Sequence, residues 1–320
     1  MNRDFMDIDR TNSIFFPHFD ECQQNVRNKN YKFVQYTSAE SALNIINGKE
    51  MWLRNTQCMN DYSEIAHGIS CLIEAYNSDI GKRFKETINS ISPEVLVKLE
   101  RDFDDWTPSF RLATYITCVS EHTPDEQQYG RLSMWRAYGG DVPVALVLNV
   151  EPFFSDSDYI FAYTHPVRYM DKTQFMDSFS QLTDRIEKEM DYLKSIDHEV
   201  LFNYLFMTFQ DIALCLKHPA FKEEREWRVV YSPNMRRSPH ISSQVVSIGG
   251  LTQTVHKLPL KNIEEIKYTG VSIPELLHEV IIGPCDHPTI VHSAFQKVLE
   301  EEGCVNVMKR IKYSGVPLRR

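Results

Sequence analysis

The chain of 320 residues lacks the patterns that mark secreted and membrane proteins. Its seven cysteines are scattered and odd in number, and no two are spaced as C-x-x-C, which argues against a disulfide framework or a zinc ribbon. No apolar run approaches the ~18–20 residues of a membrane helix. The polar and acidic start, Met1–Arg10, is unlike a signal peptide. These absences predict a cytoplasmic protein without a membrane partner.

Common cofactor and nucleophile motifs are also missing. There is no G-x-G-x-x-G and no G-x-x-x-x-G-K-[ST], which disfavours Rossmann and P-loop nucleotide sites. The absence of G-x-S-x-G weakens a serine hydrolase, and no H-E-x-x-H marks a zinc helix. The formal net charge of −9, from 44 acidic and 35 basic residues, argues against broad electrostatic capture of nucleic acid.

The residues that are present predict an α+β fold. With 42% hydrophobic and 12% aromatic residues, the chain can bury a sizeable core. No strict βαβα alternation and no repeat occurs, so a mixed or antiparallel sheet is expected. We expect a polar arm over 1–30 and a single domain over 31–320, with a helical insert at about 172–217. Strands are predicted at 31–36, 51–54, 112–119, 142–150, 159–163, 226–231, 245–248, 255–258, 263–268, 280–282 and 305–311. Helices are predicted at 38–48, from 61, at 93–105, in two pieces over 172–217, and at 287–302.

The run Lys217–Arg228 contains a pair of carboxylates at the start of a predicted strand. Residues two apart on a strand point to the same face, so Glu224 and Glu226 are expected to project side by side. Adjacent carboxylates of this kind can stabilise a positive transition state. A charged junction with surface ion pairs to Arg225 or Arg228 is the alternative.

Ser133–Gly140 is a second candidate segment, because it places two aromatic residues beside two glycines. Trp135 and Tyr138 share one face if the segment is helical, and Gly139–Gly140 lets the backbone approach a ligand closely. An aromatic core turn that ends in glycine is the alternative.

Further polar residues follow predicted strands. Arg54 could hold a phosphate with two hydrogen bonds, and Ser120 leads a strand into a loop at the edge of a cleft. Asp61 and Glu64 resemble catalytic acids, but their spacing is also that of a helix N-cap and a capping box, which we favour.

Several short motifs occur in an order that resembles a known family. They are Y-T-S with W-L-R-N-x-x-x-M-N-D, then C-V-S-E, M-W-R-A-Y-G, K-E-E-R-E-W-R-V-V and I-I-G-P. The chain resembles the bacterial family called domain of unknown function 2971, from about Tyr31 to Pro284. This resemblance indicates the kind of fold but does not indicate a reaction, because the family has no agreed function.

The chain is more distantly similar to ADP-ribosyltransferases of the DNA-targeting toxin type. That resemblance implies a split mixed sheet around NAD, with a polar first strand, a Ser or Tyr on a second strand and a late glutamate. The implied catalytic residues are Glu226 and its partner Glu224. The implied NAD-binding residues are Arg54 at the phosphates, with Tyr36, Ser120, Trp135 and Tyr138. The first strand carries Gln35 and Tyr36 where those enzymes carry His or Arg, and no Ser-Thr-Ser triplet occurs.

The function expected from this resemblance is ADP-ribosyl transfer from NAD, or NAD cleavage, without a metal. The acceptor would be nucleic acid or protein, in a toxin or phage-defence setting, and the oligomeric state stays open. A non-enzymatic sensor that binds a nucleotide or peptide is the alternative. A third is a magnesium nuclease that uses Asp61, Glu64, Glu224 and Glu226.

Overall fold

The computed structural model describes residues 7–58, 63–155, 157 and 159–317. Contacts divide the chain into two compact units, each built from three segments. The helical unit comprises Met1–Gln24, Thr56–Thr114 and His165–Glu223, and the sheet unit comprises Asn25–Asn55, Tyr115–Thr164 and Glu224–Arg320. Within the described ranges, no helix combines the length and the apolar character that crossing a membrane requires.

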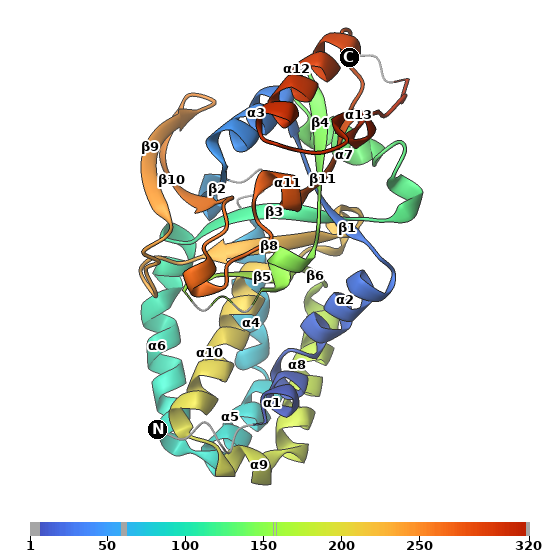
Figure 1. The fold of residues 1–320 in the computed structure, drawn as a ribbon. Helices are drawn as coiled ribbons and strands as arrows, with labels where there is room; N and C mark the ends of the chain where they lie inside the picture. Colours follow the sequence, from blue (N-terminus) through green and yellow to red (C-terminus); the bar gives the residue numbers. More distant parts are fainter. Residues whose placement is uncertain (1–6, 59–62, 156, 158, 318–320) are drawn as a thin grey trace. The chain divides into compact units, whose positions relative to one another are not determined.

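The helical unit is a set of helices packed around α10 (Figure 1). Its helices are α1 (Ile8–Phe15), the first part of α2 (Pro17–Asn28), α4 (Ser63–Tyr76), α5 (Asp79–Ile91), α6 (Pro93–Leu112), α8 (Lys172–Lys188), α9 (Met190–Ser195) and α10 (His198–Cys215). Two short parallel strands, β6 (Arg168–Tyr169) and β7 (Leu216–Lys217), complete it, and η1 (Thr56–Cys58) is a 3-10 turn.

Helix α10 is buried along most of its length, which explains its central position. Its buried residues run without a break from Thr208 to Cys215. Gly68 of α4 lies so close to α10 that an added Cβ would be 2.5 Å from the carbonyl oxygen of Ile212. The glycine therefore allows the two helices to approach closely.

Two helices lie inside the polar arm predicted for residues 1–30. Asp7 caps α1 through its side chain, which accepts a hydrogen bond from the backbone of Arg10. Ile14 and Phe15 of α1 and Val26 of α2 are buried, so their side chains are part of the packed structure. These few apolar residues, separated by polar ones, gave no helical period strong enough to predict either helix.

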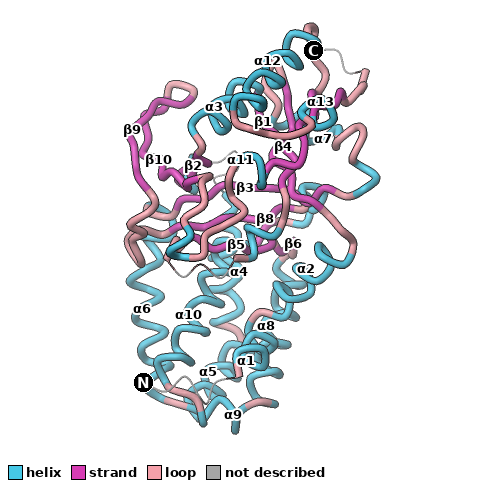
Figure 2. Tube along the Cα trace, in the orientation of Figure 1, coloured by secondary structure: helices cyan, strands magenta, loops and turns pink. Residues whose placement is uncertain are grey.

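The sheet unit contains most of the strands, drawn in magenta in Figure 2. They are β1 (Lys32–Ser38), β2 (Glu50–Asn55), β3 (Tyr115–His122), β4 (Pro143–Leu148), β5 (Ala162–Pro166), β8 (Glu226–Tyr231), β9 (Ser242–Ile248), β10 (Leu251–Pro259), β11 (Leu277–Ile282) and β12 (Ile311–Tyr313). The α-helices are α3 (Ala39–Gly48), α7 (Leu132–Tyr138), α11 (Ile273–Leu276), α12 (Pro288–Glu301) and α13 (Val307–Arg310). The 3-10 helices are η2 (Pro124–Glu126), η3 (Glu151–Phe154), η5 (Glu264–Ile266) and η4 (Pro219–Glu224), the last of which crosses the boundary between the units.

The sheet is mostly antiparallel, as the sequence predicted. Its order is β12-β11-β4-β1-β3-β2-β10-β9, with β8 paired to β3 and β5 paired to β8. Each neighbouring pair from β11 to β9 is antiparallel, and β12 joins β11 in parallel. The prediction of an α+β protein with a mixed, largely antiparallel sheet is therefore confirmed.

Strand β3 branches the sheet, because three strands pair with it. On one edge, β1 pairs with its end, where Val34 is opposite Ser120, and β2 pairs with its beginning, where Arg54 is opposite Ile116. On the other edge, β8 runs along almost its full length. The ADP-ribosyltransferase-like split sheet remains a prediction.

Most predicted elements are present, and the strand over 226–231 has the predicted bounds. Two predicted strands are wrong. Residues 263–268 form a tight turn around η5, in which Lys267 has φ +56° and Ile263 and Tyr268 make an isolated bridge. Within residues 305–311, Asn306 has φ +56° and α13 follows it. In both segments a left-handed residue interrupts a stretch whose sequence resembles a strand.

Candidate functional site

Glu226 lies at the first position of β8 and is buried. It is directly opposite Ser120 of β3, so both side chains lie on the same face of the sheet. Its Oε1 is 2.8 Å from Nε of Arg228, and the side chains of Glu226 and Arg228 are only 6% and 2% exposed. Because residues two apart on a strand share a face, β8 itself positions this ion pair.

Glu224 does not lie beside Glu226 on the strand, contrary to the prediction. It ends η4, and Arg225 between the two glutamates has φ +44°, a left-handed conformation that breaks the strand alternation. The Glu224 carboxylate instead accepts a hydrogen bond from the Tyr138 hydroxyl, at 2.9 Å. The structure thus links two predicted site residues that the sequence did not pair.

Helix α7 brings Trp135 and Tyr138 to the same face of the sheet. The Trp135 ring packs edge-on against Tyr36 of β1, with 4.8 Å between the ring centroids. Its indole nitrogen donates to the carbonyl of Tyr129 at 2.8 Å. Trp135 is completely buried in a hydrophobic cluster, which matches the aromatic-core alternative, whereas Tyr138 is only partly buried. Burial also raises the pKa of Tyr36 to about 12.

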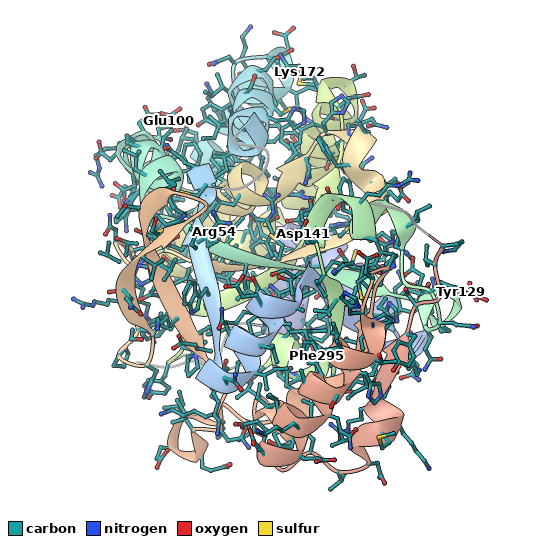
Figure 3. The ribbon with its side chains drawn as sticks, turned by 90° about the horizontal axis from the view of Figure 1, so that it is seen from above. Arg54, Glu100, Tyr129, Asp141, Lys172 and Phe295 are labelled. Carbon is teal, nitrogen blue, oxygen red and sulfur yellow. The ribbon has the colours of Figure 1, made fainter. Side chains whose placement is uncertain are left out.

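We call the face that carries Tyr36, Ser120 and Glu226 the α7 face. Arg54 belongs to it, because its partner Ile116 is four residues from Ser120 along β3. Figure 3 shows Arg54 on β2, the strand that pairs with β10 of the β9–β10 hairpin. Its Nε donates to the side-chain oxygen of Gln253 at 3.3 Å. All seven predicted site residues therefore lie on the α7 face or in the α7 and η4 segments beside it.

An arginine that the sequence reading missed holds the loop before α7. Arg131 is 6% exposed, and its guanidinium donates to Glu126 at 2.9 Å and to the carbonyls of Glu121 at 2.8 Å and Glu224 at 3.0 Å. Its backbone N–H donates to the Tyr36 hydroxyl at 2.8 Å. Arg131 therefore connects β1, the end of β3 and Glu224 in one network.

Glu126 is the acidic centre of this network. It also pairs with Arg225, and it accepts a hydrogen bond from the backbone of Thr123. Burial opposes its ionisation, but the hydrogen bond and charge of Arg131, with Arg225, outweigh burial and lower its pKa. The spacing of Thr123 and Glu126 is that of a capping box, a sequence signal that could have identified Glu126.

Two neighbouring groups on β3 are shifted towards their neutral forms. Burial raises the pKa of Glu121, although the Trp227 indole donates to its carboxylate at 3.1 Å. Burial also lowers the pKa of His122 to about 4. His122 is 3% exposed, and neither of its ring nitrogens has a hydrogen-bond partner among the described residues.

We expect Gly130→Ala to destabilise the loop that leads into α7. Gly130 has φ +64°, and an added Cβ would lie 2.7 Å from the ring of Trp135, so both the backbone and the packing oppose a side chain. The expected loss in the free energy of unfolding is about 1–3 kcal/mol, measured by denaturant titration. Gly249→Ala is the matched control: Gly249 has φ +58°, but nothing lies within 4 Å of an added Cβ. Equal losses in the two variants would show that contact with Trp135 adds nothing.

The structure describes only some of the acidic residues that the nuclease alternative would use. Asp61 and the side chain of Glu64 lie outside the described residues, so their predicted capping roles are untested. Among the residues that the structure does describe, no group of three or more His, Cys, Asp or Glu side chains could hold a metal ion.

Comparison with known proteins finds a match to a family model. Residues 134–229 match the model of a family described as a protein of unknown function, DUF2971. The match covers less than a third of the 320-residue chain and supports the resemblance to this family. It begins in α7 and ends in β8, so it includes Trp135, Tyr138, Glu224 and Glu226. No curated protein and no solved structure gave a significant match.

Proposed function

We propose that the protein cleaves NAD at the nicotinamide–ribose bond and transfers the ADP-ribosyl group to an acceptor. The observation that carries this proposal is the shared α7 face of Arg54, Ser120 and Glu226. Arg54 and Glu226 flank β3 four residues apart, which is about 13 Å along the strand. An extended dinucleotide can reach both, with its phosphates at Arg54 and its nicotinamide ribose at Glu226.

Glu226 is the group that stabilises the developing charge on the ribose. When the bond between C1′ and the nicotinamide nitrogen breaks, the leaving nicotinamide takes the bonding electrons and the ribose becomes oxocarbenium-like, as in glycoside cleavage. A carboxylate beside this carbon lowers the barrier. Arg228 holds the Glu226 carboxylate in a fixed orientation at 2.8 Å, so little reorganisation is needed.

Glu224 acts on the acceptor. It is partly buried and keeps one carboxylate oxygen hydrogen-bonded to Tyr138. The acceptor oxygen forms the new bond to C1′ and passes its proton to the Glu224 carboxylate. Water in the place of the acceptor would give NAD hydrolysis by the same steps.

A second function is favoured by the burial of the Glu226–Arg228 pair. A buried ion pair of this kind also suits a structural role, in which removing one partner deprives the other buried charge of this close contact. The protein would then be a sensor that binds a nucleotide or peptide beside Tyr138 without chemistry. Nicotinamide release separates the two functions, because only the first requires it.

We expect the purified protein to release nicotinamide from NAD, with cell lysate as the source of acceptor, and Glu226→Gln to lower the rate at least about 100-fold. Nicotinamide is quantified by chromatography, and circular dichroism establishes that the variant is folded at the assay temperature. Glu223→Gln is the matched control, because it removes an exposed carboxylate from the same run of the chain.

The possible outcomes of this assay distinguish the transferase from the sensor. A folded Glu226→Gln variant with undiminished release would overturn the proposed role of Glu226. Absence of release by the wild-type protein, together with NAD binding that Arg54→Met weakens, would favour the sensor.

A further inference from the structure

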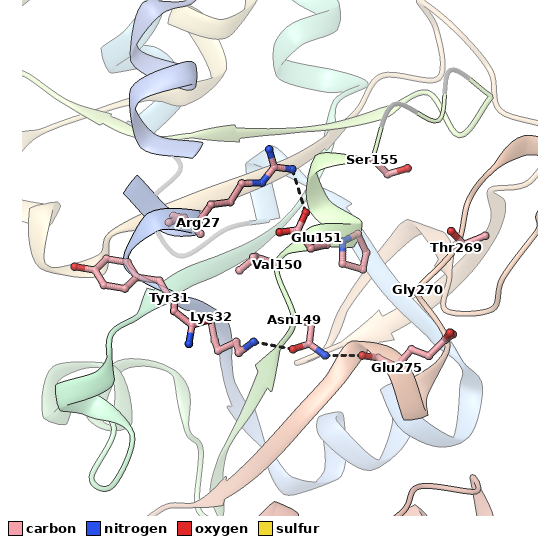
Figure 4. A pocket seen from close by; sticks show the side chains of 13 residues that line it. Arg27, Tyr31, Lys32, Asn149, Val150, Glu151, Ser155, Thr269, Gly270 and Glu275 are labelled. Atoms are coloured by element: carbon pink, nitrogen blue, oxygen red, sulfur yellow. Dashed lines mark hydrogen bonds and ion pairs between the residues drawn. The ribbon is translucent and has the colours of Figure 1, made fainter. Parts of the chain in front are cut away.

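The sheet unit contains a hollow of about 730 Å³ that the proposed function does not use. It lies where the end of α2, the start of β1, the residues after β4 and the loop before α11 meet. Figure 4 shows Arg27 and Lys32 on one side, Thr269, Gly270 and Glu275 on the other, and Asn149 and Glu151 between them. Its volume is within the ~300–1,000 Å³ range of small-molecule sites.

Lys32 is the side chain of the hollow that is best suited to bind an anion. Its ammonium is partly buried and donates to the side-chain oxygen of Asn149 at 3.0 Å. Asn149 is fixed in turn, because its amide donates to the backbone carbonyl of Glu275 at 2.6 Å. Among the described residues, no carboxylate lies within 4.0 Å of the Lys32 ammonium. A partly desolvated cation with one neutral acceptor has two donors left for an anion.

The other charged side chains of the hollow already have partners. Arg27 and Glu151 pair with each other at 3.0 Å, and both are largely exposed. The Glu275 carboxylate accepts hydrogen bonds from the Ser272 hydroxyl and from Asn262, and these bonds lower its pKa. Lys32 thus differs from these groups, because its ammonium has a neutral partner. Its charge also reaches nearby His278, whose pKa is lowered first by burial and then by Lys32.

We propose that this hollow binds a small anionic molecule through its phosphate or carboxylate group, with Lys32 as the counter-ion. The ammonium donates to the anion from the β1 side, while the hydroxyls of Thr269 and Ser155 line the hollow as additional donors. The Arg27–Glu151 pair is exposed and weakly held, so Arg27 can turn to a second anionic oxygen. The hollow shares no lining residue with the proposed NAD site, and its proposed role does not depend on NAD cleavage.

The test is calorimetric titration of the full chain with inorganic phosphate and, separately, with acetate. We expect saturable binding of at least one of the two anions, and the tighter one identifies the group that the site prefers. Lys32→Met should weaken this binding at least about tenfold, which corresponds to about 1.4 kcal/mol. Lys29→Met is the matched control, because Lys29 is an exposed lysine of the same segment that does not line the hollow, and it should leave binding unchanged.

Lys32→Arg keeps the charge and provides a second variant in case Lys32→Met does not fold. The affinity of this variant for the anion should stay within about threefold of the wild-type affinity. Lys29→Met, the control for non-specific attraction, should bind the anion as tightly as the wild type. Absence of saturable binding of both anions to the wild-type protein would overturn the proposal. Equal weakening by Lys29→Met and Lys32→Met would overturn it as well, because the attraction would then be a general surface effect.

Discussion

Glu226→Met is expected to lower the free energy of unfolding by about 3–5 kcal/mol. The change leaves the Arg228 guanidinium 2% exposed and without the carboxylate that lies 2.8 Å from its Nε. A buried charge that loses a close counter-charge still carries its cost of desolvation. Arg228→Met should destabilise the protein in the same direction, because it leaves the Glu226 carboxylate buried instead. Denaturant titration followed by tryptophan fluorescence measures both effects.

The double variant Glu226→Met/Arg228→Met should be more stable than either single variant. Replacing a whole buried ion pair by apolar side chains removes both desolvation costs together, and is often neutral or stabilising. The matched control is Lys172→Met, which breaks the ion pair with Glu74 where both side chains are about half exposed. An exposed pair of this kind contributes only about 0–1 kcal/mol.

Strict additivity of the two single effects would contradict this coupling. It would mean that the two side chains are stabilised separately by other neighbours. A loss of stability on removing Glu226 is expected whether or not Glu226 is catalytic, so the stability result is read together with nicotinamide release. Strong coupling between Glu226 and Arg228, in a wild-type protein that releases no nicotinamide from NAD, would favour the sensor.

The parts of the site that follow strand or helix periodicity could be predicted from the sequence. The charged start of β8, the aromatic turn of α7 and the arginine on β2 were each found in their own segment. Their common face could not be predicted, because it depends on which strands pair with β3 and in which register. The candidate residues could be predicted from the sequence, but their common face results from the pairing of strands that are distant along the chain.

Two features of the site have no strong local signal. Arg225 adopts φ +44°, although arginine carries no preference for the left-handed region, and this single residue turns Glu224 towards Tyr138. Arg131 bonds to the carbonyls of Glu121 and Glu224, and the latter is 93 residues away along the chain. Because every residue has a backbone carbonyl, a contact with one cannot be inferred from the amino-acid type of the partner. Such contacts become visible only when the fold is known.

The free energy of unfolding is expected to fall by about 3 kcal/mol between pH 6.5 and pH 4 because of His122 alone. The unfolded chain takes up a proton at this histidine below its ordinary pKa of 6.5, whereas burial lowers the folded pKa to about 4. The unfolded state therefore binds more protons in this range, so stability rises with pH through it. Around the ring, Glu126 favours the proton, and Arg131, Lys312 and Arg225 oppose it.

His122→Leu should remove this share of the pH dependence. It also replaces two buried ring nitrogens, which have no partner among the described residues, with apolar atoms, so stability near pH 7 should not decrease. Carboxylates and the other histidines titrate in both proteins, so the difference between their stability curves over pH 4–7 isolates His122. Parallel curves would contradict the prediction. They would mean that the folded protein accepts the proton, which requires the loop held by Glu126 and Arg131 to open and admit water to His122.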